Sequence, residues 1–240
     1  MALRILKNKQ EIATARDEMR KSGIDCADGA LRVWLKELHL LTGPRFGDRV
    51  KSWDVLGTVR FIRERLGSTD SILDLGAYAS EVLPALKRSG FTSLTGIDLN
   101  PGLREMPDAG QINYQVGNFF ESDLPSASFS AITAISVIEH GFDGNRLLSE
   151  VSRLLKPGGY FIASVDYWSE KIDTDGIKAF GLDWMIFSPA DIKKLIKGAE
   201  PFGLVPVSEL DFSTEQAPIR WLDRSYTFAW FALQKSAASE

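Results

Sequence analysis

The chain has 240 residues and a formal net charge of −4, with 44% hydrophobic and 25% charged residues. This composition is typical of a globular protein that forms one α/β domain with an extension, or two small domains. It argues against a general affinity for nucleic acid or for an anionic membrane surface, because both favour an excess of basic residues.

The beginning of the chain predicts a helical extension. The polar stretch 8–23 favours a helix that stops at Gly23. Residues 30–41 follow with a strong apolar face, and a stretch that contains glycine and proline then interrupts the pattern. We therefore predict an N-terminal helical cap over residues 1–50 and a main domain over residues 51–240.

Strand and helix patterns alternate in the middle of the chain. Apolar spacing predicts helices over residues 80–89 and 147–155, and Pro157 with the two glycines after it should stop the second one. Ser188 is expected to cap a further helix. The predicted strands cover residues 71–75, 93–98, 111–118, 129–136 and 160–168. Such alternation implies right-handed βαβ units and a mostly parallel sheet.

Two late strands are predicted over residues 203–212 and 225–235, with no helical pattern between them. Strands without an intervening helix favour an antiparallel arrangement at the edge of the sheet. The predicted fold class is therefore α/β: a Rossmann-like, doubly wound, seven-stranded and mostly parallel sheet. It has an antiparallel C-terminal edge strand and an N-terminal helical cap.

The ends of the first two predicted strands carry a ligand-binding pattern, because sheets of this kind bind ligands at the carboxyl ends of their strands. Asp74 lies near the end of the first strand, and Gly76 then removes a side chain where the backbone must pass close to a ligand. The second ends at Asp98, 24 residues after Asp74. That spacing is typical of an acid that accepts hydrogen bonds from ribose hydroxyls. The alternative for Asp98 is a carboxylate that caps the following turn.

The third strand runs into Asn118, Phe119 and Phe120. The amide oxygen of Asn118 could accept a hydrogen bond from an adenine amino group, and a phenylalanine ring could cover the adenine face. The alternatives are an Asx turn at Asn118 and a core position for one of the two rings.

His140 follows the fourth predicted strand, which ends at Ser136, and is the candidate catalytic base. A neutral imidazole can take a proton from a hydroxyl group as that group attacks. The alternative is a loop histidine that shields the site or caps the next helix. Asp166, at the end of the fifth strand, is the second choice as a base, with a solvated turn acid as its alternative.

Five ordered segments resemble the class I S-adenosylmethionine (SAM) dependent methyltransferases: ILDLGAYAS, GIDLN, GNFF, ISVIEHG and EVSRLLKPGGYFIAS. The resemblance covers about residues 53–165 and is closest to the small-molecule branch called type 11. It implies SAM as the cofactor, with a first SAM motif after the first strand, a ribose site after the second and an adenine site after the third. The predicted cofactor-binding residues are Asp74, Gly76, Ala77, Tyr78, Asp98, Leu99, Asn118, Phe119 and Ser136.

The first turn departs from the family pattern, which is richer in glycine. Tyr78 and Ser80 stand where glycines are expected, and Asn118 stands where aspartate is commoner. SAM lacks the pyrophosphate that requires the closest backbone approach, so a turn with few glycines fits SAM better than NAD. The turn is therefore expected to hold the amino-acid end of SAM.

These features predict a methyltransferase that acts on a small organic acceptor, such as a sugar or glycan hydroxyl. The irregular segment 166–184, with Trp168, Phe180 and Trp184, is expected to form the wall on the acceptor side. The alternative is a non-catalytic SAM-fold protein that binds a ligand or serves as a scaffold. A nicotinamide-dependent oxidoreductase would need the glycine turn that this chain lacks.

Cysteine and histidine content bears on compartment and metal binding. Cys26 is the only cysteine, which suits a reducing cytoplasm. Two histidines, His39 and His140, are too few to build a zinc cluster by themselves, and we predict no metal site.

No apolar run is long enough for a signal peptide or a membrane span. We expect a cytoplasmic protein with a small-molecule partner and no nucleic acid partner. The pattern does not determine the oligomeric state.

Overall fold

The computed structural model describes residues 2–40 and 46–237. The chain forms two compact units. The N-terminal unit is Ile12–Ser122, and the C-terminal unit combines Met1–Glu11 with Asp123–Glu240. The predicted division near residue 50 stays a prediction.

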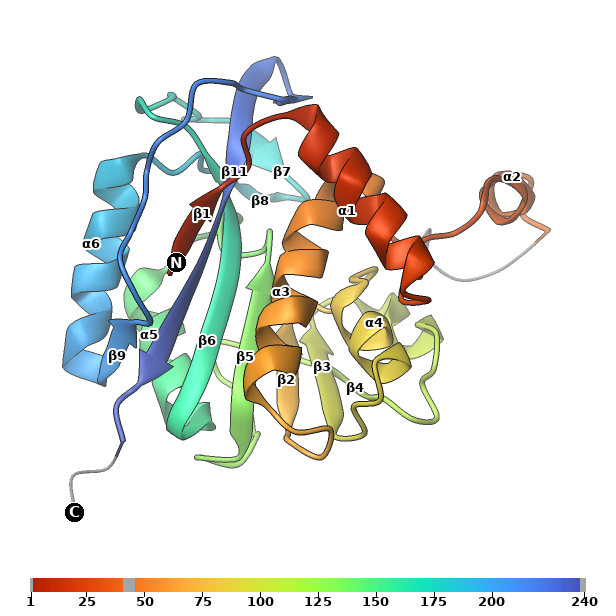
Figure 1. The fold of residues 1–240 in the computed structure, drawn as a ribbon, viewed down its shortest axis with the longest axis horizontal. Helices are drawn as coiled ribbons and strands as arrows, with labels where there is room; N and C mark the ends of the chain where they lie inside the picture. Colours follow the sequence, from red (N-terminus) through yellow and green to blue (C-terminus); the bar gives the residue numbers. More distant parts are fainter. Residues whose placement is uncertain (1, 41–45, 238–240) are drawn as a thin grey trace. The chain divides into compact units, whose positions relative to one another are not determined.

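The N-terminal unit contains three parallel strands, which lie side by side in Figure 1. Its elements, including the helix α1 that enters from the preceding residues, are α1 (Lys9–Lys21), α2 (Ala30–Glu37), η1 (Arg49–Lys51), α3 (Ser52–Arg65), β2 (Ile72–Leu75), α4 (Val82–Arg88), β3 (Leu94–Asp98), η2 (Pro101–Glu105) and β4 (Asn113–Val116). The central strand is β3, with Leu75 opposite Ile97 on one side and Asp98 opposite Val116 on the other. All four residues of β2, including Asp74, are buried, as the mostly apolar pattern of this strand predicts.

Gly96 permits close packing between β3 and its neighbours. A Cβ atom at this position would lie 2.7 Å from the Ala77 Cβ, 2.8 Å from the Tyr114 Cδ1 and 3.0 Å from the Leu83 Cδ1. The first of these residues belongs to the turn after β2. Glycine at position 96 therefore lets this turn and the adjacent strand approach β3.

Replacing Gly96 with alanine should destabilise the protein by about 1–3 kcal/mol, because the added methyl group overpacks the core. The melting temperature should fall by roughly 2–4 °C for each kcal/mol in a chain of this size. Gly110→Ala is the matched control, since no heavy atom of the described residues lies within 4 Å of a Cβ placed there. Equal unfolding curves for the two variants would contradict the packing role of Gly96.

The C-terminal unit combines a parallel strand pair with antiparallel strands, in the order β1-β11-β6-β5. Its elements are β1 (Leu3–Ile5), β5 (Phe129–Ile135), α5 (Gly144–Leu154), β6 (Leu155–Tyr167), β7 (Lys178–Ala179), β8 (Leu182–Asp183), α6 (Pro189–Ala199), η3 (Glu200–Phe202), β9 (Leu204–Pro206), β10 (Ile219–Trp221) and β11 (Arg224–Lys235). Strands β5 and β6 are parallel, whereas β11 is antiparallel to β6. The predicted α/β class, with its parallel strands and its late antiparallel strand, is confirmed.

The first strand, β1, is an addition to the predicted elements. It pairs antiparallel with β11, with Leu3 opposite Phe231 and Ile5 opposite Ala229. The backbone N–H of Leu6 then donates to the Phe228 carbonyl at 2.9 Å. A strand of three residues is too short to give a periodic signal, so its pairing partner decides its conformation.

The helix α6 begins as the sequence predicts. The Ser188 hydroxyl accepts from the Asp191 N–H, while the Asp191 carboxylate accepts from the Ser188 N–H at 2.9 Å. This reciprocal capping box satisfies two backbone donors that a helix start leaves without helical partners. Figure 1 shows α6 beside β9.

The stop signal after α5 acts differently from the prediction. The helix already ends at Leu154, and Pro157, Gly158 and Gly159 lie inside β6. Gly158 has a φ of +78°, which favours glycine, and the pairing of β5 with β6 shifts register at this end. These residues therefore shape an irregular strand start. No helix in the described part of the chain is long and apolar enough to cross a membrane.

Candidate functional site

The turn after β2 uses its backbone N–H groups within the protein. The five N–H groups of residues 76–80 all donate hydrogen bonds to other groups of the chain. The acceptors are the Ile97 carbonyl for residues 76 and 77, the Asp98 carboxylate for residue 78, the Met106 sulfur for residue 79 and the Ala77 carbonyl for residue 80. A pyrophosphate site needs such N–H groups directed at the ligand. This turn is therefore suited to a ligand without phosphate groups.

Two residues of this turn have left-handed backbone conformations. Gly76 has a φ of +69° and Ala79 a φ of +61°. Glycine adopts this region freely, whereas alanine does so at a cost of roughly 1–2 kcal/mol. The conformation at Ala79 therefore has to be held by the surrounding contacts.

Asp98, at the end of β3, connects the turn after β2 with the turn after β3. One carboxylate oxygen accepts from the Tyr78 N–H at 3.0 Å, and the other accepts from the Asn100 N–H at 2.8 Å. The carboxylate thus caps the next turn, as the alternative reading of Asp98 proposes. Each carboxylate oxygen has a further acceptor direction, and the residue is partly exposed, so Asp98 can also accept from ligand hydroxyls. Leu99 beside it is 62% exposed.

Tyr78 is accommodated because its ring packs against the following turn. A Cβ atom added to Gly102 would lie 2.8 Å from the Tyr78 Cε2, so the ring lies directly over this glycine. The Gly102 N–H donates to the Asn100 side chain at 2.9 Å, which fixes the turn under the ring. The tyrosine that replaces an expected glycine therefore has a packing partner of its own.

Asp74 is buried in β2, opposite Gly96. Burial, followed by the nearby charge of Asp74, raises the pKa of the Tyr114 hydroxyl. The charge of Asp74 therefore acts on Tyr114, which lies in β4 on the other side of β3.

The end of β4 brings the third predicted segment close to Asp98. The Gly117 N–H donates to the Asp98 carbonyl at 2.9 Å. Asn118 follows, and its side-chain oxygen accepts from the Phe120 N–H at 3.0 Å, which is an Asx turn. The ring centroids of Phe119 and Phe120 are 4.6 Å apart, and both residues are partly exposed. The first three predicted segments thus converge within the N-terminal unit.

The C-terminal unit holds the other two predicted site residues. Ser136, just beyond β5, has a φ of +53°, and its N–H donates to the Ser164 carbonyl at 3.0 Å. The backbone of His140 forms an antiparallel bridge with that of Trp184. The Gly141 N–H donates to the Asp183 carbonyl at 2.8 Å. These bonds fix the backbone that carries the imidazole.

Two aromatic rings lie beside His140. Its ring centroid is 5.3 Å from that of Phe180 and 6.4 Å from that of Trp221, both edge to face. Phe180 stacks on Trp221 at 5.9 Å and is 84% exposed. Phe180 and Gly181 both have positive φ and form the tight turn between β7 and β8. Phe180, from the segment 166–184, and Trp221, from β10, therefore present an aromatic surface beside the imidazole.

Asp166 and Trp184 have structural partners in this unit. The Trp184 indole N–H donates to an Asp166 carboxylate oxygen at 2.9 Å, and both residues are buried. The Phe187 N–H also donates to the Asp166 carbonyl at 2.8 Å. Asp166 is thus a buried acceptor for an indole, not the solvated turn acid of the alternative reading.

Sequence reasoning missed a buried ion pair in the N-terminal unit. Arg16, in α1, donates to both carboxylate oxygens of Glu81, at 2.7 and 2.8 Å. Glu81 directly follows the turn of residues 76–80. A single arginine in a polar helix pattern gives no signal that it is buried, because its partner lies 65 residues away.

A cavity of about 770 Å³ lies next to the same turn. It is lined by Ala27, Asp28, Val33, Trp34, Glu37, Phe46, Gly47, Asp48, Arg49 and Ala79. The lining combines aromatic, aliphatic and charged side chains. Among the described residues, no group of three or more histidine, cysteine, aspartate or glutamate side chains could hold a metal ion.

Cys26 packs in this region and should be chemically inert in the folded protein. Burial raises the pKa of its thiol to about 12, from a usual 9.0. Because only the thiolate reacts, we expect labelling by a disulfide reagent at pH 8 to be about a thousandfold slower than in the unfolded chain. The rate should rise about tenfold per pH unit until the pKa is reached. Rapid labelling of the native protein would contradict this burial.

Comparisons with known proteins show which domains this chain resembles. The family model described as a methyltransferase domain matches residues 73–163. Sterol 24-C-methyltransferase from Eremothecium gossypii is 29% identical over 113 residues, which cover 42% of this chain and 30% of that protein. The match thus spans less than a third of that relative's length. The predicted resemblance to class I SAM-dependent methyltransferases is confirmed.

Solved structures show the same fold. Geranyl diphosphate C-methyltransferase from Streptomyces coelicolor A3(2) superimposes with a TM-score of 0.57 and 17% identity, over 80% of this chain and 82% of that one. The cyclase SpnF gives a TM-score of 0.57 and 15% identity, over 80% of this chain and 85% of that one. One fold thus serves a methyltransferase and a protein named as a cyclase, so the activity has to be argued from the residues of the site.

Proposed function

We propose that this chain, which carries a methyltransferase domain over residues 73–163, is an enzyme that transfers a methyl group from SAM to a small organic acceptor. The main support is the turn after β2. It uses all five of its N–H groups internally and lies beside the partly exposed carboxylate of Asp98. This combination suits a nucleoside ligand that has ribose hydroxyls but no phosphate.

The residues of the N-terminal unit fit the parts of SAM. Asp98 would accept hydrogen bonds from the ribose hydroxyls, and the exposed Leu99 would offer an apolar contact to the adenosine. Asn118 has a side-chain NH₂ group and a second acceptor direction in addition to its Asx turn, and Phe119 would cover the adenine. When bound, SAM supplies a methyl group on a sulfonium, which is a ready electrophile.

His140 is the proposed base for an acceptor hydroxyl. Its Nδ1 atom is buried, so Nε2 is the nitrogen that would take the proton. Backbone hydrogen bonds on both sides of His140 fix the backbone that carries the ring. Correct alignment of the reacting groups can contribute up to about 7–11 kcal/mol to catalysis.

The acceptor should have an apolar face. Phe180 and Trp221 stack on each other and both contact the His140 ring, so they would pack against such a face. A sugar or glycan unit has apolar ring faces and hydroxyls, and it stays our specific prediction for the acceptor. The non-catalytic alternative would keep SAM binding without turnover. The single cysteine also leads us to propose a cytoplasmic location.

Calorimetric titration of the whole chain with SAM, S-adenosylhomocysteine and NAD tests the proposed cofactor. We expect micromolar binding of the first two and no binding of NAD. Incubation with SAM and a panel of sugars, phenols and lipid alcohols, followed by mass spectrometry, then tests methyl transfer. Cofactor binding with no product from any acceptor would favour the non-catalytic alternative, and absence of binding would refute the proposal.

A further inference from the structure

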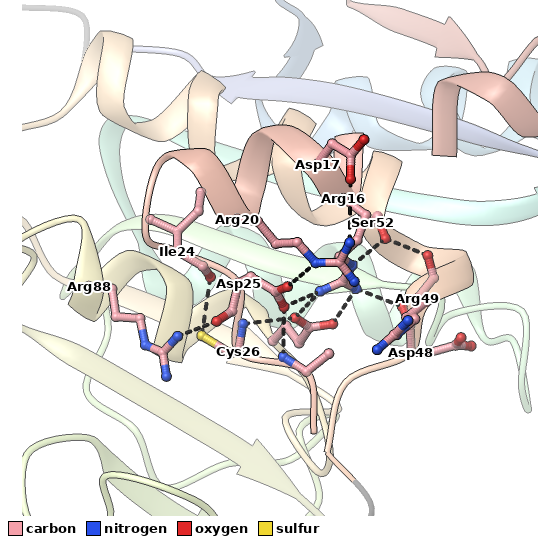
Figure 2. Close-up of polar contacts among 12 residues, drawn as sticks. Arg16, Asp17, Arg20, Ile24, Asp25, Cys26, Asp48, Arg49, Ser52 and Arg88 are labelled. Atoms are coloured by element: carbon pink, nitrogen blue, oxygen red, sulfur yellow. Dashed lines mark hydrogen bonds and ion pairs between the residues drawn. The ribbon is translucent and has the colours of Figure 1, made fainter. Parts of the chain in front are cut away.

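The Arg16 guanidinium is buried and donates hydrogen bonds to several acceptors. It is 4% exposed, and it donates hydrogen bonds from Nε and from both terminal nitrogens. In addition to Glu81, it donates to the Ser52 hydroxyl at 2.8 Å, to Asp25 at 2.8 Å and to the Asp48 carbonyl at 3.3 Å. Figure 2 shows these bonds converging on one side chain. Arg16 thus joins α1, residues near 25, and the start of α3.

Glu81 is the point where these segments meet the cofactor turn, residues 76–80. It is 2% exposed, and its carboxylate also accepts from the Cys26 N–H at 3.4 Å. A Cβ atom on Gly47 would lie 2.6 Å from a Glu81 carboxylate oxygen, so the backbone there packs directly on the carboxylate. The Glu81 carbonyl accepts from the Ala85 N–H at 3.0 Å, which starts α4. Both the side chain and the backbone of Glu81 are therefore fixed.

Opposite charges stabilise the cluster of Arg16, Asp25 and Glu81. Burial alone would raise the pKa of Asp25, but the Ala27 N–H and Arg16 together hold it below its usual value. Arg20 adds a second, more exposed contact to Asp25 at 3.1 Å. The Arg88 guanidinium, at the end of α4, donates to the Asp25 carbonyl. Helix α4 is thus tied to the same cluster at both of its ends.

A fixed Glu81 matters because the cofactor turn contains a strained residue. Ala79, two positions before Glu81, holds a left-handed conformation that alanine adopts only when the surrounding structure imposes it. If Glu81 were free to move, the backbone of residues 78–80 could relax. The Tyr78 N–H, which bonds to Asp98, would then lose its alignment.

We propose that Arg16 and Glu81 form a positioning pair that holds the cofactor turn in its binding conformation and couples it to the N-terminal segments around Cys26. This inference rests on the proposed function, because it assumes that the turn binds SAM. By reciprocity, a ligand that orders the turn also orders the segments bonded to Arg16 and Glu81. The affinity for S-adenosylhomocysteine and the protection of Cys26 should therefore change together.

The test uses the whole chain with Arg16→Met, and with Arg16→Met combined with Glu81→Leu. Calorimetry with S-adenosylhomocysteine should show at least tenfold weaker binding for both variants. The double variant leaves no unpaired buried charge, so its melting temperature should recover towards that of the wild type while its affinity stays low. A recovered melting temperature together with a low affinity distinguishes a positioning role from a general loss of stability. Recovery of affinity in the double variant would overturn the proposal.

Cys26 labelling gives a second readout. In the wild type, saturating S-adenosylhomocysteine should slow the labelling at least threefold, whereas in Arg16→Met it should have no effect. If that variant does not fold, Arg16→Lys replaces it, because lysine keeps the charge but lacks the planar fork that bonds both Glu81 oxygens. We expect at least threefold weaker ligand binding for Arg16→Lys.

Arg60→Met is the matched control. Arg60, in α3, forms an exposed ion pair with Glu18 of α1, the helix that also carries Arg16. The affinity of Arg60→Met for S-adenosylhomocysteine and the labelling rate of its Cys26 should equal those of the wild type. The proposal would be overturned if every Arg16 variant kept the wild-type affinity. It would also be overturned if S-adenosylhomocysteine left the rate of Cys26 labelling in the wild type unchanged. A wild type that binds no S-adenosylhomocysteine would refute the proposed function itself, and this inference with it.

Discussion

Asp98→Ala should weaken the binding of S-adenosylhomocysteine at least a hundredfold while the protein stays folded. The substitution removes a charged acceptor for the ribose hydroxyls, and hydrogen bonds to charged groups contribute about 1.5–3 kcal/mol each. It also removes the partners of the Tyr78 and Asn100 N–H groups, so the binding turn loses its alignment. A hundredfold loss corresponds to about 2.7 kcal/mol. Calorimetry with the ligand measures the affinity, and circular dichroism checks the fold.

Glu105→Ala is the control for charge. Glu105 is an exposed carboxylate in η2, so its removal changes the net charge equally without touching the turn. Asp98→Asn should bind at an intermediate level, because it keeps an acceptor oxygen but loses the charge. Wild-type affinity in Asp98→Ala would show that the ribose does not bind there.

His140→Ala should lower the turnover number about 100- to 10,000-fold once an acceptor is known, which is the usual range for the loss of a general base. The affinity for S-adenosylhomocysteine should stay within about twofold, because the proposed role of His140 is proton transfer. Comparison of turnover with ligand affinity therefore separates a role in proton transfer from a role in cofactor binding.

The other histidine provides the matched control for this substitution. His39 is exposed and has a φ of +57°, so His39→Asn keeps a residue type that tolerates this conformation. Its turnover should equal that of the wild type. If His140→Ala retained full turnover, the histidine would have only a structural role beside Phe180 and Trp221.

Predictions from the sequence succeeded where a short stretch carries the signal. The strands β2, β3, β4 and β5 lie within the predicted runs, because apolar runs and alternation depend only on neighbouring residues. The cap at Ser188 is equally local. Asp98 and the residues around Gly76 were placed at strand ends for the same reason, and their hydrogen bonds join them in the structure. Their ligand-binding roles stay predictions.

Other features needed the tertiary structure because their partners are distant in the chain. The strand β1 pairs with β11, and the nearby bond from the Thr227 hydroxyl to the Leu6 carbonyl spans 221 residues. The packing of Tyr78 over Gly102 explains how a bulky residue fits the cofactor turn. The sequence by itself determined the alternation of strands and helices in the middle of the chain and the polar residues at the strand ends. Only the folded chain decided which helix is tied to the cofactor turn, because the burial of Arg16 and its pairing with Glu81 depend on contacts that leave no local pattern.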